Sequence, residues 1–460
     1  MKSGSRVAVL VAAIIASSMG MIDSTAVIVA LPVMQRQLHA NAAQMQWVVD
    51  GYLLFLAALI LLGGALGDRY GRRRLFAIGT WIFALSSIAC ALAKDPALLV
   101  IARCIQGVGA ALMIPESLAL ISAAYEARER GRAIGIWSAA SAVTMAIGPV
   151  LGGWLTQSFT WRAVFFINIP LAAIVLLLAY FLVPESRAEG DRSKPDLLGS
   201  ACVTIALGLV VIALIQMQRS LADPLSLSIL GAGLALFVAF LFIERRTRAP
   251  VVPLRLFGSR AFAIANLYTL LIYAALGGAL FFVPFELIDV MKYAPTAAGA
   301  ALLPTIASVA VLSPFSGMVA DRIGPRVPLI VGGAIAAVGY ALFTRLGVGA
   351  SYAGSVLPAT VVLGVGFAIL VSPLISTVMG AAGRNDVGAA SGINSAISRV
   401  GNLIAIAAFG IVIAANGGRA LPTAAHPQGF RDAMLGAAAL ALAGAVLACF
   451  LQRPVRAEGS

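Results

Sequence analysis

Four ionisable residues lie within long apolar stretches in the first half of the sequence, where proton binding or ion pairing would have a large effect. They are Asp23, Asp50, Arg103 and Glu116. Charged side chains are costly inside a membrane, so an ionisable residue there is a candidate functional site by default. A buried carboxylate can exchange a proton, because burial disfavours its charged form while a nearby arginine favours it. We therefore predict proton exchange at Asp23, tuned by Arg103, with Asp50 and Glu116 as the next candidates.

The elements that must position these residues are membrane-spanning helices. Of the 460 residues, 61% are hydrophobic and 11% are charged, whereas soluble globular proteins have about 45–50% apolar and about 25% charged residues. This composition excludes a soluble globular chain and a disordered chain, and four cysteines are too few for a disulfide scaffold. Apolar runs of about 20 residues cross a bilayer core of roughly 30 Å. Such runs predict fourteen transmembrane helices, over 7–30, 46–67, 74–93, 98–121, 133–157, 162–183, 196–216, 224–244, 261–287, 296–320, 327–347, 354–380, 387–414 and 432–451.

The basic residues predict the orientation of these helices. If both termini and the loops after even-numbered helices share one side, that side carries 22 of the 32 lysines and arginines. The other side carries 8, and the two that remain, Arg103 and Arg399, lie inside helices. Positive residues are enriched in cytoplasmic loops, so we predict that both termini are cytoplasmic. The net charge of +13 is explained in this way, and we expect no nucleic-acid partner.

The depth of the ionisable residues follows from a helical rise of 1.5 Å per residue. Asp23, Asp50 and Arg103 lie roughly 6–10 Å from the outer ends of their helices, which would allow them to share one outward cavity. Glu116 lies nearer the cytoplasm. Two simpler interpretations stay open: Asp23 and Arg103 would also fit a static structural ion pair, and Asp50 would fit a solvated position at the membrane boundary.

An internal repeat divides the chain. The segment GALGDRYGRRRLF begins at Gly64, and GMVADRIGPRVPL begins at Gly317, with five identities at a constant offset. Both copies follow even-numbered helices, so the repeat is parallel, with its axis along the membrane normal. Helix 2 corresponds to helix 10, which requires two helices inserted between two six-helix halves. We predict an N-terminal half at 1–184, a linker with the two extra helices at 185–250, and a C-terminal half at 251–460.

Five motifs occur in a fixed order along the chain. They are IDSTAVIVALP (22–32), GALGDRYGRRR (64–74), RCIQGVGAA (103–111), GPVLGG (148–153) and WRAVFFINIP (161–170). With these motifs the sequence resembles the major facilitator superfamily, and specifically its fourteen-helix drug:proton antiporter subfamily. The resemblance implies the major facilitator fold. Two departures are Asp50, where relatives usually have a neutral residue, and Glu116, just after the helix 4 motif.

The resemblance implies a gate at the repeated loop and an antiporter motif in helix 5. The residues assigned to the gate are Gly64, Asp68, Arg69, Gly71, Arg72, Arg73, Asp321 and Arg322. The residues assigned to the antiporter motif are Gly148, Pro149, Gly152 and Gly153. A carboxylate paired with arginine can hold one state of a two-state machine and release it in the other. The simpler interpretations are that the arginines only fix topology, and that the glycines only permit close helix packing.

A central cavity is expected between the halves, lined by polar and aromatic side chains from both. The candidates are Trp47, Tyr52, Gln106, Trp137, Tyr268, Tyr273, Asn394, Ser398 and Arg399. For the second-half members, ordinary contacts between helices are the alternative. Acidic groups and aromatic rings suit lipophilic cations.

We therefore predict a proton-coupled antiporter that exports lipophilic, cationic drugs or toxic compounds from the cytoplasm by alternating access. Its partners are small-molecule substrates, protons and the bilayer, and we expect a monomer in a bacterial inner membrane. The proton gradient supplies the energy, with no cofactor, metal or catalytic residue. The alternative is a dedicated exporter of a single metabolite, antibiotic or lipid-like molecule. An enzyme is disfavoured, because no nucleophile–base pair, nucleotide loop or metal-ligand cluster is found in the sequence.

Overall fold

A computed structural model describes residues 3–187, 196–247, 250, 252–382, 386–416, 421–422 and 427–451. Parts of the predicted linker, 188–195 and 248–249, and the chain ends at 1–2 and 452–460 lie outside the described residues. Every regular element in the described part is a helix. Fourteen segments within it are long and apolar enough to cross a membrane, which confirms the predicted all-α, fourteen-helix membrane fold.

The first group of helices precedes the predicted linker. It comprises α1 (Ser3–Gln37), α2 (Ala42–Tyr70), α3 (Arg72–Leu92), α4 (Pro96–Ala124), α5 (Ala127–Ser158), α6 (Ala163–Phe166) and α7 (Asn168–Phe181). The predicted helix at 162–183 is broken between α6 and α7. Pro170 has no N–H to donate to the carbonyl of Phe166, so the regular helix is interrupted there.

Two helices and a short connector follow, namely α8 (Leu197–Met217), α9 (Pro224–Arg246) and the 3₁₀ turn η1 (Leu254–Gly258). The second group comprises α10 (Arg260–Phe285) with its π-helical extension η2 (Glu286–Val290), α11 (Pro295–Ala300), α12 (Leu303–Ile323), α13 (Arg326–Phe343), η3 (Tyr352–Val356), α14 (Leu357–Ala381), α15 (Val387–Ala415) and α16 (Pro427–Ala448). The predicted helix at 296–320 is split into α11 and α12, because Pro304 cannot donate to the carbonyl of Ala300.

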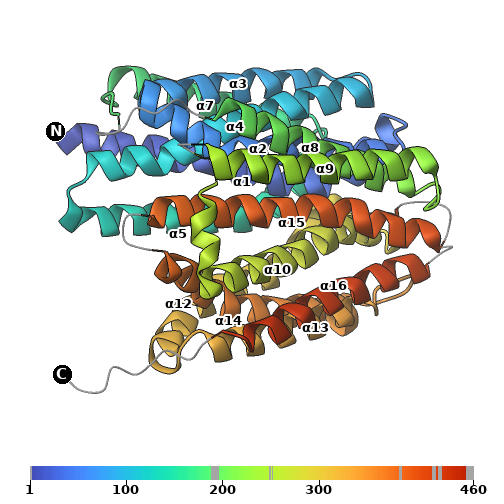
Figure 1. Cartoon of the computed structure of the whole chain (residues 1–460). Coiled ribbons are helices and arrows are strands. Elements are labelled where there is room, and N and C mark those ends of the chain that lie inside the picture. Colours follow the sequence, from blue (N-terminus) through green and yellow to red (C-terminus); the bar gives the residue numbers. More distant parts are fainter. Residues whose placement is uncertain are drawn as a thin grey trace.

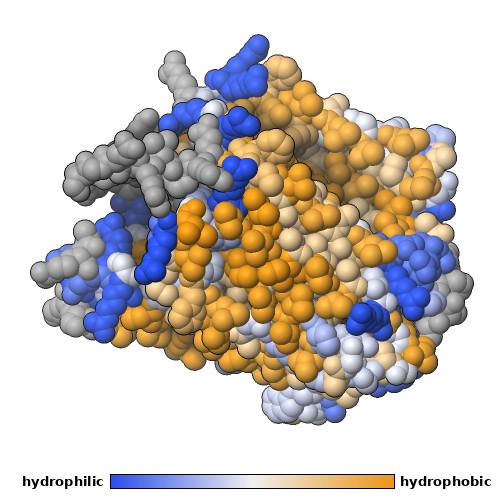
Figure 2. All heavy atoms as spheres, turned by 90° about the horizontal axis from the view of Figure 1, so that it is seen from below, coloured by the Kyte–Doolittle hydropathy of each residue, from blue (hydrophilic) through white to orange (hydrophobic). Residues whose placement is uncertain are grey.

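The two groups pack side by side, with all the long helices roughly parallel (Figure 1). The start of α1 and the end of α16 lie at the same end of the molecule, called here the terminal end, and the opposite end is called the distal end. Along the surface, a band of apolar side chains separates hydrophilic residues at the two ends, as expected for a chain that spans a bilayer (Figure 2). The hairpin of α8 and α9 packs through α8 against α2 and α15, which belong to different groups.

Close contacts join the two groups at the distal end. The amide N–H of Thr296 donates to Oε1 of Gln157 at 3.3 Å, and Arg36 forms an ion pair with Asp289. Near the terminal end, by contrast, a Cβ atom added at Gly135 of α5 would meet open space. The two groups are therefore in close contact at the distal end, while α5 has room beside it at the terminal end.

The repeated loop has the same backbone geometry in both groups. Gly71 ends α2 with φ of 120°, and Gly324 ends α12 with φ of 82°. Each donates its N–H to a carbonyl four residues earlier, Gly67 at 2.9 Å and Ala320 at 2.8 Å. A side chain disfavours this positive φ, which explains why both copies of the motif have glycine here.

Replacing Gly324 tests this conformational requirement. We expect Gly324→Ala to lower the free energy of unfolding by about 1 kcal/mol, because alanine is strained at positive φ. Thermal unfolding of the purified protein in detergent measures the change. Gly380→Ala is the matched control, since Gly380 is helical and a Cβ atom there would meet open space. Equal melting temperatures for the two variants would contradict the prediction.

Candidate functional site

A buried polar network joins α1, α3, α4 and α7. The Asp23 carboxylate accepts from Nη1 of Arg103, from Nε2 of Gln106 at 2.9 Å and from Nδ2 of Asn168 at 3.3 Å. Gln106 also accepts from Arg103 at 2.7 Å and donates to Oγ of Ser87 at 2.8 Å. Each of these five side chains is at most 1% exposed. The predicted partners Asp23 and Arg103 are thus in direct contact and sealed from solvent.

The guanidinium of Arg103 is held on its other sides as well. Its Nε donates to the carbonyl oxygen of Val48 at 2.9 Å, and its Cζ lies 4.3 Å from the ring centroid of Tyr52. The ring of Phe165 lies 5.8 Å away. Glycines allow the supporting helices to approach, since a Cβ atom at Gly107 would lie 2.5 Å from the Tyr52 carbonyl oxygen. The charge is therefore stabilised by a carboxylate, a carbonyl and a ring face together.

The other two candidate carboxylates do not join this network. Asp50 and Glu116 are each fully buried, and neither carboxylate has a hydrogen-bond partner among the described residues. Gln46 and Leu54 lie one helical turn before and after Asp50, on the same face of α2. Gln46 bonds to Gln218, just after α8, and Leu54 lies next to Gly208 of α8. Asp50 therefore lies on the face of α2 towards α8. The sequence-based expectation that Asp50 shares a cavity with Asp23 and Arg103 is not supported by these contacts, nor is a solvated boundary position.

Glu116 lies on α4 against the end of α2. A Cβ atom at Gly67 would overlap its carboxylate, so the carboxylate packs directly on the backbone beside Asp68. A side chain at position 67 would displace the end of the Glu116 side chain from this place. This position puts Glu116 next to the repeated loop, which its place in the sequence did not reveal.

Neutralising Asp50 and Glu116 tests whether they remain buried without a partner. We expect Asp50→Asn and Glu116→Gln to leave the free energy of unfolding unchanged, or to raise it by about 1–3 kcal/mol, because each change removes a carboxyl group that must either lose its hydration as an anion or take up a proton when it is buried. Thermal unfolding in detergent gives the comparison. A clear loss of stability in either variant would show that its carboxylate is bound by a partner.

The loop between α2 and α3 contains the predicted arginine–carboxylate pair. Arg72 donates to Oδ1 of Asp68 through Nε at 2.9 Å and Nη2 at 2.7 Å. Glu185, which sequence reasoning missed, accepts from the backbone N–H of Arg73 at 3.0 Å and lies 3.8 Å from Nε of Arg74. Glu185 thus ties the chain after α7 to the start of α3.

The other residues assigned to the gate lie outside the Asp68–Arg72 pair. Arg69 lies over the ring of Tyr70 at 5.4 Å, and a Cβ atom at Gly64 would lie 3.7 Å from Pro115 of α4. In the second copy of the loop, none of the described ion pairs includes Asp321 or Arg322, and both are exposed.

The glycines of the predicted antiporter motif pack closely against neighbouring helices. Gly148 and Gly152 pack against Thr25 and Ala26 of α1. Gly153 packs against the Pro295 backbone, and the carbonyl of Pro149 packs against Gly299. Close packing through small residues therefore operates at this motif. Pro149 and Gly153 also bring α5 against α11 of the second group, at the distal end.

Of the predicted cavity residues in the first group, Gln106 and Tyr52 belong to the network or contact it, and the two tryptophans make other contacts. Gln106 is part of the network, and Tyr52 is 1% exposed beneath Arg103. Trp137 donates to Oγ of Ser17 at 3.0 Å, which links α5 to α1. Trp47 is partly buried and packs against the apolar core.

Three of the second-group candidates make contacts that are structural. Tyr268 is fully buried and donates to the Leu329 carbonyl at 2.8 Å, which joins α10 to α13. Asn394 accepts from Thr269 at 2.7 Å, and Ser398 bonds within its own helix. For Tyr268 the expectation of a cavity position is wrong, because its hydroxyl is used between helices. Arg399 and Tyr273 are both partly buried, and Tyr273 packs against the apolar core.

Two members of the network, Ser87 and Asn168, were not predicted. Asn168 also donates to Ser87 at 3.1 Å, so the two connect α3 and α7 to the Asp23 carboxylate. The sequence signal for Asn168 lies in the motif WRAVFFINIP, where it is the one amide and follows five apolar residues. Ser87 carries no comparable signal, because serine is common in membrane helices.

Comparison with known proteins gives the class. The sequence profile described as Major Facilitator Superfamily matches residues 13–406. The chain belongs to this superfamily, and it is therefore a multi-pass membrane transporter of small molecules.

Two relatives show which members of the superfamily it resembles. It is 37% identical over 413 residues to "Multidrug resistance protein Stp" of Mycobacterium tuberculosis (strain CDC 1551 / Oshkosh), covering 87% of this chain and 75% of that protein. It is 33% identical over 418 residues to the "Tetracenomycin C resistance and export protein" of Streptomyces glaucescens, covering 90% and 77%. These relatives agree with the drug:proton antiporter subfamily that the motifs indicate.

A solved structure supports the fold alone. A bacterial homolog to the human lysosomal transporter Spinster, in an inward-facing and unoccupied conformation, matches with a TM-score of 0.70 and 17% identity. The match covers 97% of each chain.

Proposed function

We propose that this transporter exports lipophilic, cationic drugs from the cytoplasm in exchange for protons. The observation that carries the proposal is the Asp23–Arg103–Gln106 network, in which a fully buried carboxylate accepts hydrogen bonds from one arginine and two amide side chains. Protonation of Asp23 would release Arg103 from its ion pair and so change the forces that hold α1 against α4. The resistance and export proteins among the relatives support drugs as the cargo.

The direction of export rests on the orientation of the chain. We place the terminal end on the cytoplasmic side of a bacterial inner membrane, because 22 of the 32 basic residues are assigned to that side. With this orientation, the distal contacts of α5 close the outer side, and the room beside Gly135 faces the cytoplasm. Rocking of the two groups, with boundaries near 184 and 251, would then expose the substrate site to each side in turn.

Proton release from purified protein tests the exchange directly. Substrate added to weakly buffered, detergent-solubilised protein should release protons if binding and protonation compete. We expect release with lipophilic cations and little with neutral or anionic compounds of similar size. Binding of cations without any proton release would overturn the exchange, and release only with neutral or anionic compounds would overturn the cationic substrate class.

A further inference from the structure

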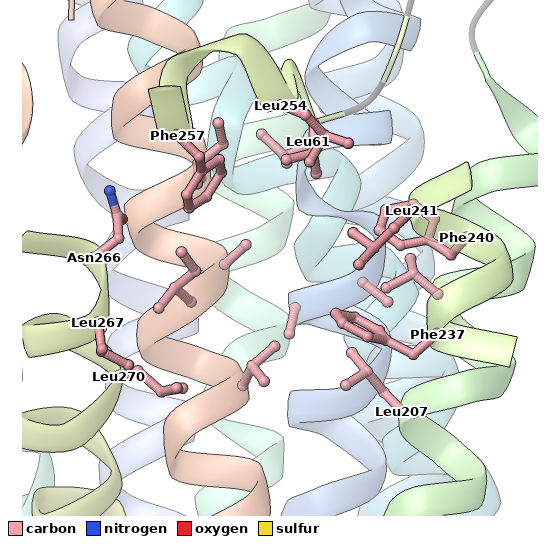
Figure 3. Close-up of a pocket in the computed structure, with 18 of the residues that line it drawn as sticks. Leu61, Leu207, Phe237, Phe240, Leu241, Leu254, Phe257, Asn266, Leu267 and Leu270 are labelled. Atoms are coloured by element: carbon pink, nitrogen blue, oxygen red, sulfur yellow. The ribbon is translucent and has the colours of Figure 1, made fainter. Parts of the chain in front are cut away.

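A deep apolar pocket lies on the flank of the molecule, away from the network described above. Its volume is about 520 Å³. Figure 3 shows α10 and α9 on opposite sides of the pocket, with α15 and α2 behind it and η1 across its top. Figure 1 shows η1 crossing α15 between α9 and α10 at the terminal end. The pocket therefore lies where the inserted hairpin meets both groups of helices.

The lining of the pocket is that of a hydrocarbon site. All the residues that line it are apolar except Asn266, whose Nδ2 donates to the Phe262 carbonyl of its own helix at 2.9 Å. The rings of Phe237, Phe240 and Phe257 form much of its wall. The lining segments belong to membrane-spanning helices and the connector, so the pocket lies at the depth of one lipid leaflet near the terminal end.

Basic residues stand next to the pocket on the side of the terminal end. Arg245 and Arg246 follow the lining residue Leu241 by about one turn of α9, and Arg260 begins α10. All three are exposed, and none of the described ion pairs includes them. Arg255 of η1 is different, because it binds Asp386 through two bonds at 2.7 and 2.9 Å. Positive charge is thus available at the edge of an apolar pocket.

We propose that the pocket holds an acyl chain of an anionic phospholipid, with its phosphate bound by Arg245, Arg246 and Arg260. The amphipathic arrangement matches such a lipid, which presents a hydrocarbon chain next to a negative headgroup. Arginine recognises phosphate well, and basic residues near a bilayer surface favour anionic lipids. A lipophilic cation, the substrate class proposed above, would be repelled by the same arginines. The lipid would therefore be a bound structural lipid and not a transported substrate.

Native mass spectrometry of the full-length protein tests the headgroup. Delipidated protein is offered phosphatidylglycerol or phosphatidylcholine with identical acyl chains. We expect the wild-type protein to retain phosphatidylglycerol in preference to phosphatidylcholine. In the double variant Arg245→Gln/Arg246→Gln, the ratio of retained phosphatidylglycerol to retained phosphatidylcholine should fall roughly tenfold. The double variant Arg130→Gln/Arg132→Gln is the charge-matched control, since both arginines are exposed on α5 near the terminal end. Equal loss in the two double variants would overturn the proposal.

Photo-cross-linking tests the acyl chain. Phosphatidylglycerol with a diazirine on its chain should label residues of the pocket, and Ala396→Phe should reduce this labelling by filling the pocket. Ala408→Phe places the same ring on α15 outside the pocket and should not reduce it. Labels scattered over lipid-facing helices, or displacement of the lipid by a cationic substrate, would overturn the proposal. These readouts do not depend on transport, so the proposal and the export function can fail separately.

Discussion

The Asp23→Asn variant is expected to lose drug-dependent proton release while it keeps the size and shape of the side chain. Asparagine does not titrate, so any exchange that runs through Asp23 stops. The change also leaves Arg103 buried without its counter-charge, and breaking a buried ion pair from one side costs about 3–5 kcal/mol. Proton release from detergent-solubilised protein, together with thermal unfolding, measures both effects.

A double variant separates proton coupling from a purely structural ion pair. Asp23→Asn/Arg103→Gln removes both charges, so it should recover much of the stability lost in the single variant. If Asp23 carries the proton, the stable double variant still releases none. If the pair is only structural, proton release returns with stability, and the proposed role of Asp23 is wrong. Asp50→Asn serves as the control for a buried carboxylate outside the network.

Gly153→Val is expected to open the distal end and to abolish transport. A Cβ atom at Gly153 would overlap the Pro295 carbonyl, so α5 and α11 could no longer approach as they do here. Overpacking costs about 1–3 kcal/mol, which shifts a two-state equilibrium roughly 5- to 150-fold. The population should therefore move towards a state with the distal ends apart.

Distance measurements between spin labels can follow this shift. Labels at positions 158 and 292, near the distal ends of α5 and η2, should move apart in Gly153→Val. Gly135→Val is the matched control, because Gly135 lies on the same helix and faces open space. An unchanged distance in Gly153→Val would mean that the contact with Pro295 does not hold this end closed.

The fold could be predicted from the sequence because each helix is a long apolar run and the repeated loop fixes the number of insertions. The breaks after Phe166 and Ala300 were not predicted. Apolar residues continue through both breaks, and only the missing N–H of Pro170 and Pro304 marks them. Hydrophobicity reports the crossing of a membrane, whereas backbone hydrogen bonding decides where a helix is continuous.

The site was predicted in part. The sequence predicted the depth of each residue along its helix, but not the direction in which its side chain points around the helix axis. Depth follows from counting residues, and it correctly brought Asp23 near Arg103. Orientation follows from an uneven distribution of polarity, but α2 is apolar on nearly all sides. Successive side chains of a helix point about 100° apart, so the sequence did not determine which neighbouring helix the side chain of Asp50 faces. For the same reason Tyr268 was assigned to a cavity, although it bonds to α13.

A single amide joins the inserted hairpin to both groups of helices. Nε2 of Gln218, just after α8, donates to Oε1 of Gln46 in α2 at 2.7 Å and to the Ala407 carbonyl of α15 at 3.3 Å. An amide nitrogen has two hydrogens, and each is engaged by a different group. If the groups part at the distal end, at least one of these bonds must break in a poorly hydrated place. The two inserted helices therefore add to the free energy of opening at that end, and they bias the resting transporter towards the conformation seen here.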